Sequence, residues 1–357
     1  MRNWRLDHAP LMLAGAYMIA VVALCRPQLP ALLQFLAGYA LSLFSVWAMV
    51  GLCVLLGATI RAQRGGSGTS ASAIARRFIA RSWAADRGLS VLSPLLTVVL
   101  LLCSYNIYKA FYLPTAGFWF EGYADAADRL LFGGDAWRLT HAALPSPWAT
   151  QAIDMAYHGW FLPMVVGVAL CSFAPPQARL RQRYLLAYVL LWIVQGSILA
   201  YLMPAAGPCF YGAFQADPSR FAALTSLLDG QNRFLLAQGA PGLYALVYQN
   251  ALLSLHHAPE MAMGAGISAM PSMHNAMAVL FACAAWACDR RLGVAAALYA
   301  LLIWIGSVHL GWHYAADGIV AAALTLATWT ALARLPASRP LSTSKRSGAM
   351  AAQPAAI

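Results

Sequence analysis

The sequence predicts an all-α integral membrane protein, a polytopic helix bundle with about eight transmembrane helices. Of its 357 residues, 61% are hydrophobic and only 10% are charged, and the mean hydropathy is +0.63. A soluble globular protein carries roughly a quarter charged residues, so this composition excludes that class and disordered chains as well. A membrane-spanning helix needs roughly 20 mostly apolar residues. The predicted spans are 10–25, 31–60, 89–111, 155–174, 184–203, 272–288, 292–310 and 313–333.

The first two spans predict an N-terminal anchor. Span 10–25 is short, but no small-x-small cleavage site precedes Arg26, so we expect an anchor and not a signal peptide. Span 31–60 is long enough to tilt in the bilayer. Residues 61–75, rich in Arg, Gly and Ser, predict a flexible cytoplasmic linker. The predicted units are a two-helix anchor with its linker at 1–88, the main membrane domain at 89–335, and a disordered cytoplasmic tail at 336–357.

The basic residues predict the orientation. The chain has 23 Lys and Arg against 12 Asp and Glu, a net charge of +11. In a membrane protein such an excess marks cytoplasmic loops, so we expect no nucleic-acid partner. With the N-terminus inside, 17 of the 23 basic residues fall in cytoplasmic segments. Both termini are therefore expected in the cytoplasm, and two long loops, 112–153 and 204–270, are expected outside, where loops of this length often cap a site.

The start of span 272–288 is a candidate anion site. Pro271 favours the first position of a helix, so the free backbone N–H groups that follow and the Ser272 hydroxyl can bind an anion. His274 lies within one turn and can exchange a proton with the bound group. The alternative is an ordinary proline-started span with a solvated histidine at its end.

A second candidate lies at the start of span 313–333. His313 and Asp317 are four residues apart, on one helix face. The carboxylate can accept the Nδ1–H and leave Nε2 as a nucleophile, although a buried structural pair is the alternative. His309 is a supporting candidate for substrate binding if it is not simply structural. Both spans run from outside to inside, so the two histidine-containing starts are expected at similar depth near the outer surface.

A metal site is the competing interpretation of these residues. His274, His309, His313 and Asp317 are of zinc-ligand type, and two histidines four residues apart are a common ligand spacing. No Glu follows His309 as in a metalloprotease helix, and a phosphate pocket has no role in a zinc site. The seven cysteines form no C-x-x-C pair. We therefore expect no metal and no other cofactor.

At these residues the sequence resembles the type-2 phosphatidic acid phosphatase superfamily. The superfamily motifs Pro-Ser-Gly-His and His-x-x-x-Asp read here Pro271-Ser272-Met273-His274 and His313-Tyr314-Ala315-Ala316-Asp317. The likeness covers about residues 105–330. Within it, the segment from Gly266 to His274, Tyr201–Pro208 and Phe132–Asp135 resemble bacterial members of the inositol-phosphorylceramide synthase branch.

The resemblance implies a six-helix catalytic core, within the main membrane domain, that cleaves a lipid phosphoester at the outer leaflet of the bacterial inner (plasma) membrane. In this mechanism His313 attacks the phosphorus to form a phosphohistidine and Asp317 orients it. His274 protonates the leaving alcohol and Ser272 binds phosphate oxygens. The branch implies transfer of a phosphorylated headgroup to a lipid or small alcohol. The alternative reaction is hydrolysis of a lipid phosphate or isoprenoid diphosphate to free phosphate. The alternative to an enzyme is a transporter that uses an intramembrane His/Asp pair as its proton site.

The sequence also departs from the superfamily pattern. The run Lys-x6-Arg-Pro is absent, and Gly306-Ser307 stands where Ser-Arg is expected. Phosphate charge must then be met by other cations. Lys109 is the first candidate, because a lysine at a membrane span is costly, and Arg220 and Arg233 in the outer loop follow. For each of the three, a headgroup or acid contact is the alternative.

Overall fold

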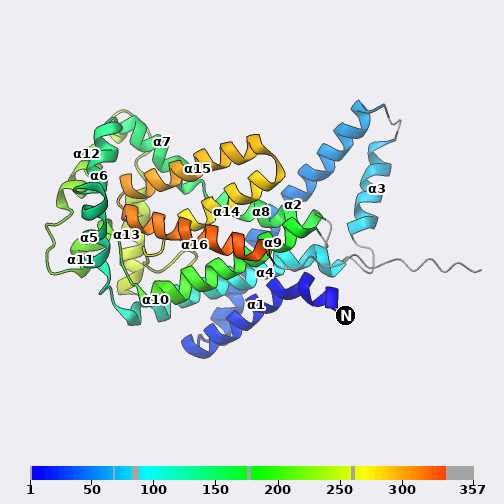
Figure 1. Ribbon diagram of the computed structural model, residues 1–357, viewed down its shortest axis with the longest axis horizontal. Coiled ribbons are helices and arrows are strands. Elements are labelled where there is room, and N and C mark those ends of the chain that lie inside the picture. The colour runs from blue at the N-terminus through cyan, green and yellow to red at the C-terminus, as the bar shows by residue number, and fades with distance from the viewer. Residues whose placement is uncertain (1, 67–68, 83–87, 175–177, 259–261, 335–357) are drawn as a thin grey trace, which may run out of the picture.

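The computed structural model describes residues 2–66, 69–82, 88–174, 178–258 and 262–334 (Figure 1). Within these ranges the chain consists of helices, turns and loops, with no β-strand. Long helices lie side by side across the centre of the molecule, and shorter ones gather at one end. The all-α prediction is confirmed.

Seven stretches of the described chain are long and apolar enough to cross a membrane. They match seven of the eight predicted spans, and their surfaces expose apolar side chains of the kind that face lipid. The first three stretches are His8–Cys25 of α1 (Arg2–Cys25), α2 (Leu29–Arg64), and Gly88–Ala116, which joins α4 (Gly88–Ile107), η1 (Tyr108–Tyr112) and η2 (Leu113–Ala116). The next two are Pro147–Phe173, which joins α7 (Pro147–His158) and α8 (Phe161–Phe173), and Arg179–Leu202, which joins α9 (Arg179–Ile193), η3 (Val194–Leu199) and α10 (Ala200–Leu202). The last two are α15 (Arg290–His309) and α16 (Ala315–Ala333).

The remaining predicted span, 272–288, is the shorter helix α14 (Met273–Cys288). It has 16 residues, fewer than the roughly 20 of a typical span. Both its ends are fixed by polar groups. Ser272 caps the start of α14. Asp289 follows the last residue of α14 and caps the next helix, α15, because its side chain accepts hydrogen bonds from the backbone N–H groups of Arg291 and Leu292. The count of eight full-length spans therefore becomes seven plus one short apolar helix.

The short helix lies at the centre of the bundle. It packs closely against α15 in a hairpin and also contacts α16, α9 and α8. Its inward side chains, such as Ala276, Met277 and Leu280, are fully buried. The helices α4, α7–α8, α9, α14, α15 and α16 form a six-helix core, and α1 and α2 pack against α4, α8 and α9 on its outside.

The two predicted outer loops are largely helical. They form a cap of short helices at one end of the bundle, at the left of Figure 1. Proline or left-handed glycine residues mark several of the helix boundaries; for example, Gly133, with φ of 69°, follows the end of α5. The cap helices are α5 (Glu121–Phe132), α6 (Ala136–Ala143), the first part of α7, η4 (Pro208–Phe210), α11 (Tyr211–Phe214), α12 (Ala222–Ala237) and α13 (Tyr244–His257).

The predicted linker at 61–75 is only partly a loop. Helix α2 continues to Arg64 and α3 (Ala71–Ser82) begins at Ala71, so both ends of the predicted linker are helical. The Arg- and Ala-rich sequence explains this, because both residues are strong helix formers. The predicted tail at 336–357 lies outside the described residues.

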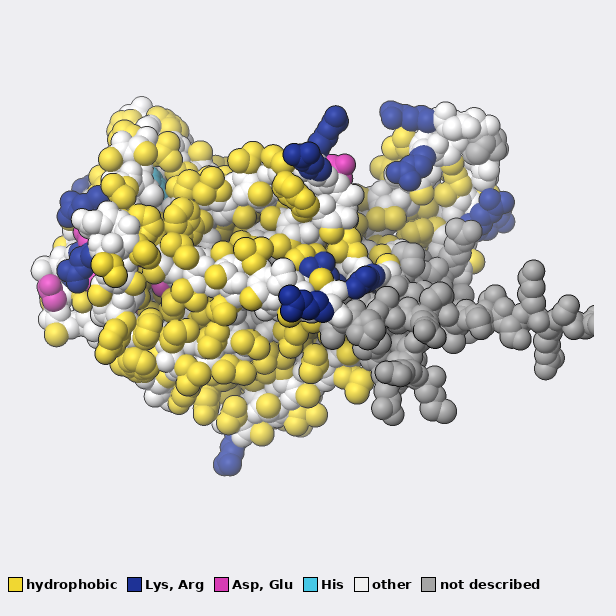
Figure 2. Space-filling model, viewed as in Figure 1, with side chains coloured by type: hydrophobic (Ala, Val, Ile, Leu, Met, Phe, Trp, Pro, Cys, Tyr) yellow, Lys and Arg dark blue, Asp and Glu magenta, His cyan; other side chains and the backbone are white. Residues whose placement is uncertain are grey.

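Charged side chains divide between the ends of the bundle. Figure 2 shows a mostly hydrophobic middle, with Lys and Arg side chains gathered at the end that carries α3 and the start of α15. The acidic side chains of this view lie mainly at the cap end. The basic residues of the first end include Arg61, Arg64, Arg76, Arg77, Arg179, Arg183, Arg290 and Arg291.

Candidate active site

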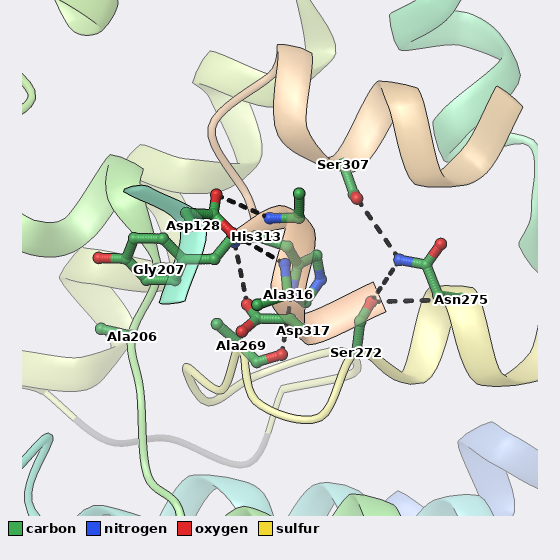
Figure 3. Close-up of polar contacts among 12 residues, drawn as sticks. Asp128, Ala206, Gly207, Ala269, Ser272, Asn275, Ser307, His313, Ala316 and Asp317 are labelled. Atoms are coloured by element: carbon green, nitrogen blue, oxygen red, sulfur yellow. Dashed lines mark hydrogen bonds and ion pairs between the residues drawn. The ribbon is translucent and has the colours of Figure 1, made fainter. Parts of the chain in front are cut away.

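The starts of α14 and α16 lie side by side at the cap end of the bundle (Figure 3). The Ser272 backbone N–H donates to the carbonyl oxygen of Asp317 at 3.4 Å, which links the two helix starts. The imidazole rings of His274 and His313 have centroids 5.9 Å apart. The structure therefore brings together two motifs that are separated by nearly 40 positions in the sequence.

His313 is held in one orientation by two oxygen acceptors. Its Nδ1 lies 2.9 Å from the carbonyl oxygen of Ala269 and 3.4 Å from Asp317 Oδ2. Since both partners are acceptors, Nδ1 carries the proton and Nε2 keeps its lone pair. The same Asp317 oxygen accepts the Tyr314 backbone N–H at 3.0 Å, so the carboxylate is itself fixed.

His274 faces the same space from α14. Its ring stacks on Tyr157, with centroids 4.6 Å apart and planes 16° apart, and it contacts Trp160 at 4.2 Å. Within the described residues, no carboxylate contacts this imidazole. It is therefore enclosed by aromatic rings, while His313 is held by a carboxylate and a carbonyl.

A cavity of about 530 Å³ joins these groups. Lys109, His158, His274 and His313 line it together with a larger number of apolar and aromatic side chains. A pocket of this size and apolar lining with a few convergent polar groups is the usual form of a ligand site. Among its other lining residues are Tyr39, Tyr105, Asn106, Tyr157, Trp160, Met164, Trp192, Phe210, Tyr248, Leu252, Met273 and Trp312.

Lys109 is the one basic candidate of the sequence analysis that the structure brings to the cavity. It lies in η1, a short π-helix that continues α4, and such widened turns are frequent at functional sites. Its backbone packs directly on Gly266, where a Cβ atom would collide with the Lys109 carbonyl group. Gly266 has φ of 89°, a backbone conformation that favours glycine.

The other two basic candidates lie elsewhere. Arg220 forms ion pairs with Asp125 and Asp135, so its guanidinium is already engaged, and these pairs raise its pKa further. The same contact lowers the pKa of Asp135. Arg233 is exposed on α12 and does not line the cavity. The structure thus brings neither guanidinium to the two histidines.

Two further candidates lie behind the cavity wall. Ser272 is fully buried, caps α14 and accepts a hydrogen bond from the Asn275 amide at 2.9 Å. His309 is also fully buried, with Thr150 2.8 Å from its Nε2 and the ring of His141 stacked 3.6 Å away. Neither side chain lines the cavity, so both support neighbouring structure.

Two buried carboxylates of α5 fix the start of α16, and sequence reasoning missed both. Asp128 accepts the backbone N–H groups of Ala315 and Ala316, at 2.9 and 2.8 Å. Glu121 accepts the Tyr314 hydroxyl at 2.7 Å and the backbone N–H of Gly207 at 3.0 Å. Burial raises the pKa of Glu121 to about 7 and that of Asp128 to about 6. Acidic residues in a predicted outer loop do not indicate that their partners lie 187 to 193 positions later in the chain.

Asn275 connects the two histidine motifs from behind. Its amide nitrogen donates to Ser272 Oγ at 2.9 Å and to Ser307 Oγ at 3.4 Å, as Figure 3 shows. The Ser307 carbonyl oxygen in turn accepts the His313 backbone N–H at 3.1 Å. Within the described ranges, no group of three or more His, Cys, Asp or Glu side chains is arranged to hold a metal ion.

Comparison with known proteins identifies the family of this chain. The family model of the PAP2 superfamily matches residues 126–331, which include both histidine motifs and most of the cap. No curated protein and no solved structure matches the chain significantly. The family match covers more than half of the chain and accords with a helical membrane bundle. The chain therefore belongs to the PAP2 superfamily, and its activity is of the phosphatase or phosphotransferase type on a lipid phosphate in a membrane.

Proposed function

We propose that this protein cleaves a lipid phosphoester through a phosphohistidine at His313 and transfers the phosphorylated headgroup to a lipid or small alcohol. The observation that carries this proposal is the convergence of His274, His313 and Lys109 on one largely apolar cavity, with Asp317 behind His313. A lipid phosphate matches such a cavity, because it combines a charged phosphate group with an apolar hydrocarbon body.

The first half-reaction uses the two imidazoles on opposite sides of phosphorus. Nε2 of His313 attacks, because its Nδ1–H is held by Ala269 and Asp317. The bond from phosphorus to the lipid oxygen breaks, and protonated His274 gives its proton to the departing alkoxide. His274 suits this role because it faces the same cavity as His313, and no carboxylate among the described residues holds its proton.

Phosphate charge is met by the lysine and by a helix start. Lys109 supplies the positive side chain in the cavity. The first backbone N–H groups of α14, at Met273 and His274, lie at the positive helix end, and both residues line the cavity. The corresponding groups of α16 are already bonded to Asp128, so α14 is the helix that binds the anion.

We place the cavity at the outer leaflet, with both termini in the cytoplasm. The support is the charge distribution, because basic side chains gather at the end of the bundle opposite the cap (Figure 2). Such residues favour the cytoplasmic side. A bacterial inner membrane agrees with the sequence likeness to bacterial members of the branch.

Transfer is favoured over hydrolysis by the lining of the cavity. Aromatic rings cover His274 and surround the reacting groups, which limits the access of water and leaves room for a bulky acceptor. The inositol-phosphorylceramide synthase branch, suggested by residues 266–274, agrees with transfer.

The test is an assay of purified protein with headgroup-labelled phosphatidylinositol, with labelled phosphatidate and with isoprenoid diphosphate, each with and without ceramide or diacylglycerol. We expect acceptor-dependent formation of a new phosphorylated lipid. His313→Ala is expected to abolish turnover while the variant elutes as a folded protein, and His257→Gln, an exposed histidine of the cap, serves as the matched control. Free phosphate as the sole product with every acceptor would establish a phosphatase instead.

A further inference from the structure

The cavity contains a third histidine that the proposed mechanism leaves unused. His158 is the last residue of α7 and lines the cavity with His274 and His313. It precedes the two-residue turn between α7 and α8, and its neighbour Tyr157 stacks on the His274 ring. A titratable side chain beside the reacting groups is a candidate for proton transfer.

His158 is oriented by a carboxylate in the same way as His313. Its Nδ1 lies 3.0 Å from Asp154 Oδ1 and 2.9 Å from the Asp154 carbonyl oxygen. Both partners are acceptors, so the proton is on Nδ1 and the lone pair is on Nε2. No hydrogen-bond partner for Nε2 is found among the described residues, and the side chain lines the cavity and is 22% exposed.

The carboxylate that orients His158 is rigid. Asp154 is fully buried, and its two oxygens also accept the backbone N–H groups of Tyr244 and Ala245 at the start of α13, at 2.6 and 3.0 Å. Helix α13 forms another wall of the cavity, and its Tyr248 stacks on the His158 ring with centroids 5.1 Å apart. The imidazole is therefore fixed in place and keeps one nitrogen for the cavity.

We propose that His158, oriented by Asp154, is the general base that takes the proton of the acceptor hydroxyl in the second half-reaction. This rests on the proposed phosphohistidine. The acceptor oxygen bonds to phosphorus, the bond from phosphorus to Nε2 of His313 breaks, and its electron pair returns to that nitrogen. The acceptor proton moves to Nε2 of His158. His158 then gives up one proton and His274 takes one up before the next turnover, which restores the starting state.

The surroundings of the two histidines support this division of roles. Proton uptake creates an imidazolium, and the Asp154 carboxylate stabilises that charge on His158. His274 is enclosed by Tyr157 and Trp160 without such a partner, which favours proton release.

The test separates formation of the phosphoenzyme from its breakdown. The enzyme is mixed with lipid labelled in the phosphorylated headgroup, quenched at early times, and assayed for acid-labile protein-bound label and for product. His158→Phe keeps a ring against Tyr248 without a nitrogen, and His158→Gln is a second variant in case the first fails to fold. For both we expect the phosphoenzyme to form within about twofold of the wild-type rate. Acceptor-dependent turnover should fall about 100-fold or more, in the range of a lost general base.

Further arms distinguish a base from a purely structural residue. In His158→Ala, added imidazole should restore turnover, and His257→Gln should behave as wild type. Unchanged turnover in His158→Phe and His158→Gln would overturn the inference, as would equal loss of phosphoenzyme formation and turnover in both. If wild-type enzyme makes product but forms no phosphoenzyme, the proposed phosphohistidine itself is refuted. Failure of the proposed mechanism is thereby distinguished from failure of the assignment of His158 as the base.

Discussion

At the residue scale, the site is built from imidazoles whose partners differ. His313 and His158 each have a carboxylate at Nδ1, whereas His274 has aromatic rings on its faces. Chemically identical side chains thereby become suited to nucleophilic attack, proton uptake and proton release. The orientation of each ring is as important as its presence in the cavity.

The Asp317 carboxylate offers a test of this orientation. In Asp317→Asn, the amide can donate to Nδ1 of His313 and stabilise the wrong tautomer, so Nε2 loses its lone pair. We expect kcat to fall by about a factor of 10³ to 10⁴, as in carboxylate-to-amide changes of catalytic triads, with little change in KM. Steady-state kinetics with the lipid donor measure this. A loss confined to KM would show that Asp317 contributes to binding and not to the tautomer.

The sequence predicted the positions of His274 and His313 because their motifs begin two spans that run in the same direction. It could not predict which cations meet there. Arg220 was a reasonable candidate until the fold placed it between Asp125 and Asp135, which are 95 and 85 positions away. His158 was not singled out because an isolated histidine after an apolar stretch gives no signal of Asp154 as its partner. Long-range pairing decides these roles, and a single sequence does not reveal it.

At the scale of elements, the start of α16 is held by another helix as well as by its own Asp317, which accepts the Tyr314 backbone N–H. Its first backbone N–H groups bond to Asp128, and Tyr314 bonds to Glu121, both on α5. The cap thus fixes the helix that carries Asp317. The sequence predicted loops here because short amphipathic helices lack the long apolar stretches that identify spans, and only packing against the bundle stabilises them.

Glu121 makes this support sensitive to pH. Burial raises the pKa of its carboxyl from 4.5 to about 7, so in the folded protein it stays protonated over a range where the unfolded chain is ionised. Its contribution to the free energy of unfolding is complete below about pH 4.5 and is lost as pH rises through about 7. The loss amounts to about 3 kcal/mol, from 1.36 kcal/mol per pKa unit.

We therefore expect the melting temperature of the detergent-solubilised protein to fall between pH 5 and pH 8. In Glu121→Gln this dependence should be reduced, leaving the smaller part that arises from Asp128, whose pKa of about 6 shifts in the same direction. Thermal melts of both proteins across this range measure the difference. Parallel curves for wild type and variant would contradict the assignment to Glu121.

At the scale of the whole molecule, the N-terminal helices contribute to the cavity as well as to membrane attachment. Tyr39 of α2 is buried and lines the cavity, although it lies far before the residues matched by the family. The helices α1 and α2 also pack on α4, which continues into the turn with Lys109. From the sequence alone these helices are assigned to a separate anchor, because an apolar run does not indicate which helices it packs against.

The proposed orientation of the bundle also has a direct test at this scale. Ala216, exposed in the cap, and Gln63, exposed near the end of α2, lie at opposite ends of the molecule. In a variant whose seven native cysteines are replaced, Ala216→Cys should react with a membrane-impermeant maleimide in intact cells. Gln63→Cys should react only after lysis, because the basic residues beside it favour the cytoplasmic side. The reverse labelling pattern would place the cavity at the inner leaflet, and a donor lipid of the cytoplasmic face would then be required.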